Sequence, residues 1–156
     1  MPLQQRIRQQ LIFWLPVGIF TSLLATWLLL RLLRHLRSPR NSMLDALNSE
    51  AIQVYYQPII SLQDGKIAGA EALARWQQPD GTFLSPDIFI PLAEQTGLIT
   101  QLTEDIVRKI FADLGPWLRQ RPEVHISINL SVDDLRSPTL PTLLHDQLQH
   151  RGIAAA

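Results

Sequence analysis

Two charged side chains stand four residues apart in a run of small apolar residues, Gly69-Ala-Glu-Ala-Leu-Ala-Arg-Trp76. If this run is a strand, Glu71, Leu73 and Arg75 share one face and the intervening alanines share the other. A carboxylate is a good ligand for a hard metal ion, and a guanidinium can hold a phosphate through a fork of hydrogen bonds. Charges are rare on the packed side of a sheet, so the pattern indicates a binding site or an ordinary cross-strand ion pair.

A second stretch also combines an apolar face with a polar one. Val124-His-Ile-Ser-Ile-Asn-Leu-Ser131 alternates strictly between apolar and polar residues. Parallel strands that are buried on both faces usually read as continuous apolar runs, so this polar face favours a polar site shared with the strand that carries Glu71. By itself, Asn129 would be an ordinary hydrogen-bonding residue at a strand end, and His125 is interpreted as packed or solvated rather than as a ligand.

The elements that position these residues follow from turn and capping signals. Two strands, over residues 53–62 and 66–76, are separated by Asp64-Gly65 and predict an antiparallel hairpin, with Pro58 placing the first strand at an edge or a bulge. A short helix from Asn41 or Ser42 to about Ala51 precedes the hairpin.

Two helices are expected between the hairpin and the alternating strand. Ser85-Pro-Asp begins the first, which Gly97 ends, and its expected buried residues are Ile88, Leu92 and Ala93. The second covers about residues 100–118, and Gly115-Pro116 could divide it. A last helix begins at Pro138 or Pro141 and ends near Gln149. This order of strands and helices predicts an α/β fold with parallel strands.

The N-terminal part has a different composition. Residues 11–30 carry no charge and would form a helix about 30 Å long, which matches the hydrocarbon core of a bilayer. We therefore expect a tail over 1–10, a transmembrane helix over 11–33, and a basic juxtamembrane linker with the short helix over 34–50. A cleaved signal peptide and a buried soluble helix are the alternatives. Arginines are more frequent after the span than before it, which places the C-terminal part in the cytoplasm.

The whole chain has 156 residues, no cysteine and a formal net charge of zero. The zero conceals an asymmetry, because residues 1–40 contain six basic residues and no acid. A basic segment before an acidic body is typical of a membrane flank followed by a soluble part. The lack of cysteine excludes disulfides, thiolate catalysis and cysteine-bound zinc.

Four motifs occur together in one order: Tyr55-Tyr-Gln-Pro-Ile59, Glu71-Ala-Leu73 with Arg75-Trp76, Pro91-Leu-Ala-Glu-Gln-Thr-Gly-Leu98 and Ser127-Ile-Asn-Leu-Ser131. Together they resemble the EAL domain, the cyclic di-GMP phosphodiesterase family. The resemblance covers residues 51–156 and implies the first part of a modified TIM barrel. It further implies a single-pass protein of the bacterial inner membrane.

The resemblance also implies roles for individual residues. Glu71 and Asn129 match metal ligands, and Gln57, Leu73 and Arg75 match positions that contact the dinucleotide. The family reaction converts cyclic di-GMP to linear pGpG with two Mg²⁺ or Mn²⁺ ions. An EAL-type homodimer is a further implied partner, whereas no DNA or RNA duplex is expected.

The sequence departs from the family after residue 151, where further strands would bring another glutamate, a paired-aspartate motif and a lysine. A TIM barrel takes about 250 residues. We therefore expect a truncated phosphodiesterase that is inactive as this chain. The alternatives are a noncatalytic membrane module that binds nucleotide or a partner protein, and a small membrane protein whose soluble tail has no function.

Overall fold

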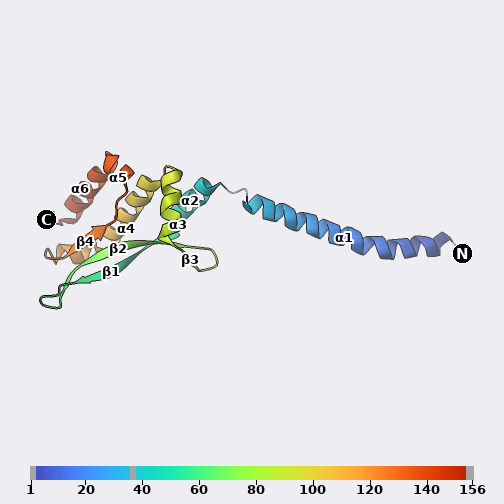
Figure 1. Cartoon of the computed structure of the whole chain (residues 1–156), viewed down its shortest axis with the longest axis horizontal. Helices are drawn as coiled ribbons and strands as arrows, with labels where there is room; N and C mark the ends of the chain where they lie inside the picture. The colour runs from blue at the N-terminus through green and yellow to red at the C-terminus, as the bar shows by residue number, and fades with distance from the viewer. Residues whose placement is uncertain (1–2, 36–37, 154–156) are drawn as a thin grey trace. The chain divides into compact units, whose positions relative to one another are not determined.

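The computed structural model describes residues 3–35 and 38–153, and it divides the chain into two compact units, Met1–Ser38 and Pro39–Ala156. The first unit is one helix, α1 (Leu3–His35), shown in blue in Figure 1. Its segment Trp14–Leu33 is long and apolar enough to cross a membrane. A signal sequence can have the same length and composition. The helix begins at Leu3, so the expected tail over 1–10 is largely helical; Met1 and Pro2 lie outside the described residues.

The second unit begins with α2 (Pro39–Asn48) and the hairpin of β1 (Ile52–Ile60) and β2 (Ile67–Gln77). The helix begins two residues before the expected cap at Asn41 or Ser42, because proline suits the first helical turn, where its missing N–H costs nothing. The antiparallel pairing of β1 and β2 is confirmed, and β1 lies at an edge of the sheet of the described residues, which is one of the two positions that Pro58 predicted. A register shift lies between Ile59 and Ile60, near the turn. Residues 36 and 37 of the expected linker lie outside the described residues.

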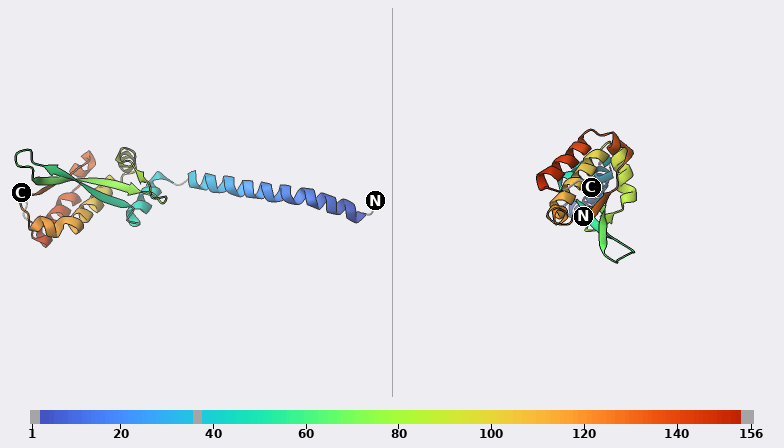
Figure 2. Two further views of the ribbon diagram at one scale, coloured as in Figure 1. Left: turned by 90° about the horizontal axis from the view of Figure 1, so that it is seen from below. Right: turned by 90° about the vertical axis from the view of Figure 1, so that its left-hand side faces the viewer.

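The rest of the unit alternates helices with short strands. Its elements are β3 (Phe83–Leu84), α3 (Pro86–Gln95), α4 (Ile99–Arg119), β4 (His125–Ile128), α5 (Val132–Arg136) and α6 (Thr139–Arg151). β4 runs parallel to β2, which confirms the α/β prediction. Figures 1 and 2 show the helices of this unit on one face of the sheet, whose other face carries no helix.

The alanine side of β2 faces the helices, as the alternation predicts. Ala72 and Trp76 are buried in the main core cluster, and Ala74 packs against it. The helices contribute the large buried side chains of this core, which include Met43, Phe89, Leu102, Ile106 and Ile110. Small residues on this side of the strand leave room for these large helix side chains. The opposite face, which carries Glu71, Leu73 and Arg75, is half-buried.

Three local expectations were wrong. Ile88 is 58% exposed, and Phe89 takes its place on the buried side of α3; Ala93 is buried as expected, and Leu92 is half-buried. α4 continues through Pro116, because one missing backbone hydrogen bond is outweighed by the burial of Leu118 beyond it. β4 ends at Ile128 rather than at Ser131, because Ser131 leaves the strand to begin α5.

Candidate functional site

The polar face of the sheet gathers the residues that the sequence singled out. Gln57 on β1 lies directly opposite Glu71 on β2, and Glu71 lies opposite Ser127 on β4. Side chains that are directly opposite in a ladder share a face, with Cβ atoms about 5 Å apart. Three neighbouring strands therefore present Gln57, Glu71 and Ser127 side by side.

Glu71 and Asn129 come into direct contact. The Asn129 amide Nδ2 donates a hydrogen bond to Oε1 of Glu71 at 2.9 Å, although the two residues are 58 positions apart in the chain. Asn129 directly follows the last residue of β4, so its side chain can reach across to β2. The carboxylate of Glu71, in the middle of β2, is thus adjacent to the side-chain amide of Asn129, just beyond the carboxyl end of β4.

Close approach of β2 and β4 depends on Gly69. A Cβ atom at this position would lie 2.6 Å from the His125 carbonyl oxygen and 2.9 Å from the His125 imidazole. Only glycine avoids this clash, so Gly69 allows the register in which Glu71 reaches Asn129. His125 is exposed on this face, in agreement with its interpretation as a solvated residue.

Arg75 continues the same face of β2, about 13 Å along the strand from Glu71. Its Nη1 donates to the carbonyl oxygen of Ala74 at 2.8 Å, and the guanidinium lies 6.0 Å from the ring centroid of Tyr55. It forms no ion pair with Glu71 among the contacts of the described residues. The alternative interpretation, in which Glu71 and Arg75 form an ordinary ion pair, therefore does not describe this structure.

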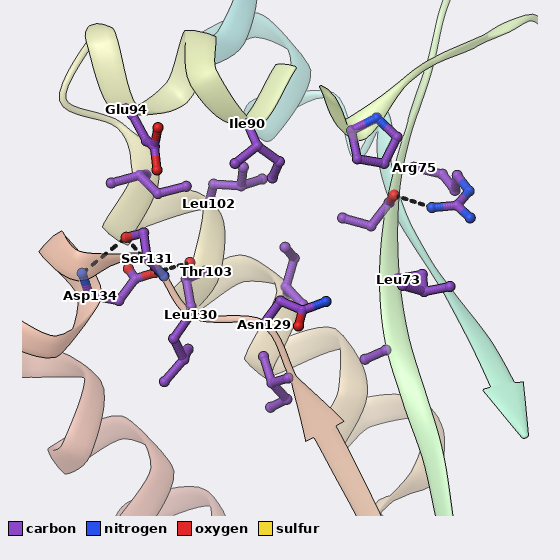
Figure 3. A pocket seen from close by; sticks show the side chains of 16 residues that line it. Leu73, Arg75, Ile90, Glu94, Leu102, Thr103, Asn129, Leu130, Ser131 and Asp134 are labelled. Carbon is purple, nitrogen blue, oxygen red and sulfur yellow. Dashed lines mark hydrogen bonds between the residues drawn. The ribbon is translucent and has the colours of Figure 1, made fainter. Parts of the chain in front are cut away.

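A cavity of about 210 Å³ opens beside β2, between the end of β4 and the helices α3 and α4. Figure 3 shows Leu73 and Arg75 on one side of it and Leu102, Thr103 and Ser131 on the other. Asn129 and Glu94 also line it. The cavity adjoins the Glu71–Asn129 pair, because Asn129 belongs to both.

The sequence reasoning missed a buried carboxylate at this cavity. Asp134 is 1% exposed, and its Oδ2 accepts hydrogen bonds from the Ser131 backbone N–H, the Ser131 hydroxyl and the Thr103 hydroxyl, each at 2.9 Å. Ser131 and Asp134 also form a capping box at the start of α5. The spacing Ser131-x-x-Asp134 is the signal that could have found this helix.

Over the part of the chain that the structure describes, no group of three or more histidine, aspartate or glutamate side chains could hold a metal ion. The Glu71–Asn129 pair supplies two oxygen-bearing groups, which are of the kind that Mg²⁺ and Mn²⁺ prefer. The site can therefore offer part of a ligand set. The binding roles of Glu71, Asn129, Gln57, Leu73 and Arg75 stay predictions.

The fold and this face define an α/β sheet with helices on one side and a polar, carboxylate-bearing surface on the other. The EAL domain family matches residues 40–156, and the chain belongs to this family. The resemblance that the four motifs indicated is thereby confirmed.

Among curated proteins, the chain is 53% identical over 148 residues to the probable cyclic di-GMP phosphodiesterase PdeB of Escherichia coli K12, covering 95% of this chain and 29% of PdeB. It is 38% identical over 116 residues to the probable cyclic di-GMP phosphodiesterase PdeG of the same organism, covering 74% of this chain and 23% of PdeG. The chain thus spans less than a third of the length of either relative.

Among solved structures, the PaMucR phosphodiesterase in complex with c-di-GMP is similar, with a TM-score of 0.66 and 28% identity. The similarity covers 74% of this chain and 47% of that structure. The α/β fold described above is therefore the EAL fold over the part that the two share.

Proposed function

We propose that the polar face of β1, β2 and β4 is one wall of a cyclic di-GMP phosphodiesterase site. The observation that carries this proposal is the contact between Glu71 and Asn129, two family ligand positions that meet at 2.9 Å although they are 58 residues apart. Family membership and the identity to PdeB support the same reaction class.

In this proposal Glu71 and Asn129 hold a Mg²⁺ or Mn²⁺ ion through a carboxylate and an amide oxygen. The residue types fit, because a carboxylate and a side-chain amide each carry a hard oxygen. The Asn129 amide, whose Nδ2 faces Glu71 in this structure, would turn to present its oxygen to the ion. Bound metal ions would stabilise the attacking and leaving oxygens of a phosphodiester. Arg75 would exchange its bond to the Ala74 carbonyl for a phosphate oxygen, and Gln57 and Leu73 would contact the dinucleotide.

We further propose that the 156 residues do not hydrolyse cyclic di-GMP on their own. Two ligands leave most of the coordination shell of even one divalent ion to water, since such ions take six or more oxygens. Turnover would then need further ligands from outside the residues that this chain supplies.

The proposal includes a membrane anchor in the bacterial inner membrane, with the EAL part in the cytoplasm. The exposed side chains of Trp14–Leu33 and the arginines that follow support it. Arg31 lies 5.3 Å from the ring centroid of Trp27, which pairs two residue types that favour the membrane interface at the same end of the span.

The test measures hydrolysis and binding of cyclic di-GMP by the full chain in nanodiscs with Mn²⁺. We expect no pGpG above the level of a Glu71→Ala control, and calorimetric binding that weakens in Arg75→Ala. Turnover that Glu71→Ala abolishes would overturn the proposed inactivity. Absence of binding at high micromolar nucleotide would overturn the nucleotide-site assignment.

A further inference from the structure

We propose that Asp134 is a positioning residue that holds Asn129 in reach of Glu71. The inference rests on the proposed function, in which Asn129 is a metal ligand. The hydrogen bonds to the Asp134 side chain come from Ser131 and Thr103, and none comes from Glu71 or Asn129. Asp134 therefore acts on Asn129 through the backbone between Ser131 and Asn129.

The Asp134 side chain forms a junction between α5 and α4. Its buried Oδ2 joins Ser131, at the start of α5, to Thr103, which is 4% exposed on the core helix α4. α5 has five residues and is too short to hold its own position. The link to α4 therefore fixes Ser131 against the rigid core of the unit.

Asn129 is only two residues before Ser131 in the chain, so the junction also limits the position of Asn129. Two residues span at most about 7 Å. On the other side, the ladder between β2 and β4 ends with Ile128 opposite Ala72. The Asn129 backbone is thus fixed on both sides, by the sheet through Ile128 and by the Asp134 junction through Ser131.

The carboxylate of Asp134 is buried. Oδ1 of Asp134 is enclosed and has no hydrogen-bond partner among the described residues, whereas Oδ2 accepts three. An exposed carboxylate could cap α5 without this desolvation cost. Burial instead ties the cap to Thr103, which gives the segment one defined position relative to α4.

The test uses the full chain in nanodiscs and compares Asp134→Ala with Asp133→Ala. Asp133 is the matched control, because it lies in the same helix and carries the same charge, but it is exposed and only 3.6 Å from Arg136 in a surface ion pair. Asp134→Asn is the conservative variant, since its amide oxygen keeps an acceptor at this position and can hold two of the three bonds. Circular dichroism first verifies that each variant is folded at the temperature used.

Two readouts separate positioning from mere stability. In Asp134→Ala we expect the ¹⁵N signal of the Asn129 side-chain amide to shift and broaden, and Mn²⁺ affinity to fall about tenfold, as for other supporting residues of metal ligands. Asp134→Asn should change both readouts less than Asp134→Ala does, and Asp133→Ala should keep both near wild type. A folded Asp134→Ala variant with an unchanged Asn129 signal would overturn the inference.

The two proposals fail in different ways. If the wild-type chain binds no Mn²⁺, the metal role of Asn129 fails, while the Asn129 amide signal still tests the positioning by Asp134. If Asp134→Ala does not fold, Thr103→Val removes one of the three donors and keeps the side-chain shape. We then expect a smaller shift of the same amide signal, and an unchanged signal in Thr103→Val would contradict the inference.

Discussion

The amide of Asn129 donates to the carboxylate of Glu71 at 2.9 Å and so joins the carboxyl end of β4 to the middle of β2. Parallel pairing of the two strands, with Glu71 opposite Ser127, brings these residues within reach. The contact lies on the exposed face of the sheet, opposite the helices. The fold thus determines the geometry of this contact, and a ligand in solution can reach it.

The Asn129→Ala variant should lose little stability. An exposed hydrogen bond of this kind contributes about 1 kcal/mol, because water replaces the lost partner. Thermal unfolding of the full chain, followed by tryptophan fluorescence, measures the change, with Ser127→Ala on the same strand face as the control. A loss of several kcal/mol would mean that Asn129 is mainly a structural residue.

The Gly69→Ala variant should be clearly destabilised. Its Cβ would lie 2.6 Å from the His125 carbonyl oxygen, which is backbone and cannot move without disturbing β4. We expect a loss of about 1–3 kcal/mol in the free energy of unfolding.

The matched control for Gly69 is Gly115→Ala in α4. There the nearest atom is Cδ of the flexible Arg151 side chain at 3.0 Å. Alanine is favoured over glycine inside a helix by about 1 kcal/mol, so this variant should be near neutral or more stable. Equal destabilisation of the two variants would contradict the close-approach argument.

Because of Tyr56, we expect the stability of the folded chain to depend on pH in the alkaline range. Burial raises the pKa of its phenol above the ordinary value of about 10, and the hydrogen bond that it donates to Asp113 at 2.7 Å acts in the same direction. The folded chain therefore holds this proton more tightly than the unfolded chain. The resulting stabilisation is complete below pH 10 and is lost as the pH rises above it.

The Tyr56→Phe variant should be less stable by about 1 kcal/mol at neutral pH and should show a flatter decline above pH 10. Melting temperatures between pH 7 and 11 check this, with the exposed Tyr55→Phe as the control. If the melting temperature of Tyr56→Phe falls above pH 10 as steeply as that of the wild type, other titrating groups cause the fall.

Much of the fold could be predicted because local signals agreed with the final packing. Asp64-Gly65 predicted the hairpin, and the alternation in β2 predicted which side chains face the helices. The family motifs named Glu71 and Asn129, and the structure brings the two together.

The errors arose where tertiary contacts decide. Ile88 and Phe89 are equally apolar neighbours, and only the position of α3 against Trp76 selects Phe89, whose ring lies 6.1 Å from the Trp76 ring. β4 ends shortly before Ser131, which caps α5, and the Asp134 side chain of this cap is bonded to Thr103 on α4. A single-strand pattern contains no information about such a partner.

The membrane orientation that we propose for α1 predicts the behaviour of fusion proteins. A fluorescent protein fused after Ala156 should fluoresce in Escherichia coli membranes, and alkaline phosphatase fused at the same point should be inactive, because in the proposed topology the arginines after the candidate span lie in the cytoplasm. An active phosphatase fusion would reverse the topology. A fusion shortened by removal of its N-terminus would identify a signal peptide instead.

We propose that Glu71 and Asn129 together bind a divalent metal ion. The most direct measurement is electron paramagnetic resonance of Mn²⁺ titrated into the full chain in nanodiscs, compared with Glu71→Gln, Asn129→Ala and the control Ser127→Ala. We expect saturable Mn²⁺ binding that weakens at least about tenfold in both ligand variants and is unchanged in the control. Equal Mn²⁺ binding by wild type and the two ligand variants would contradict it.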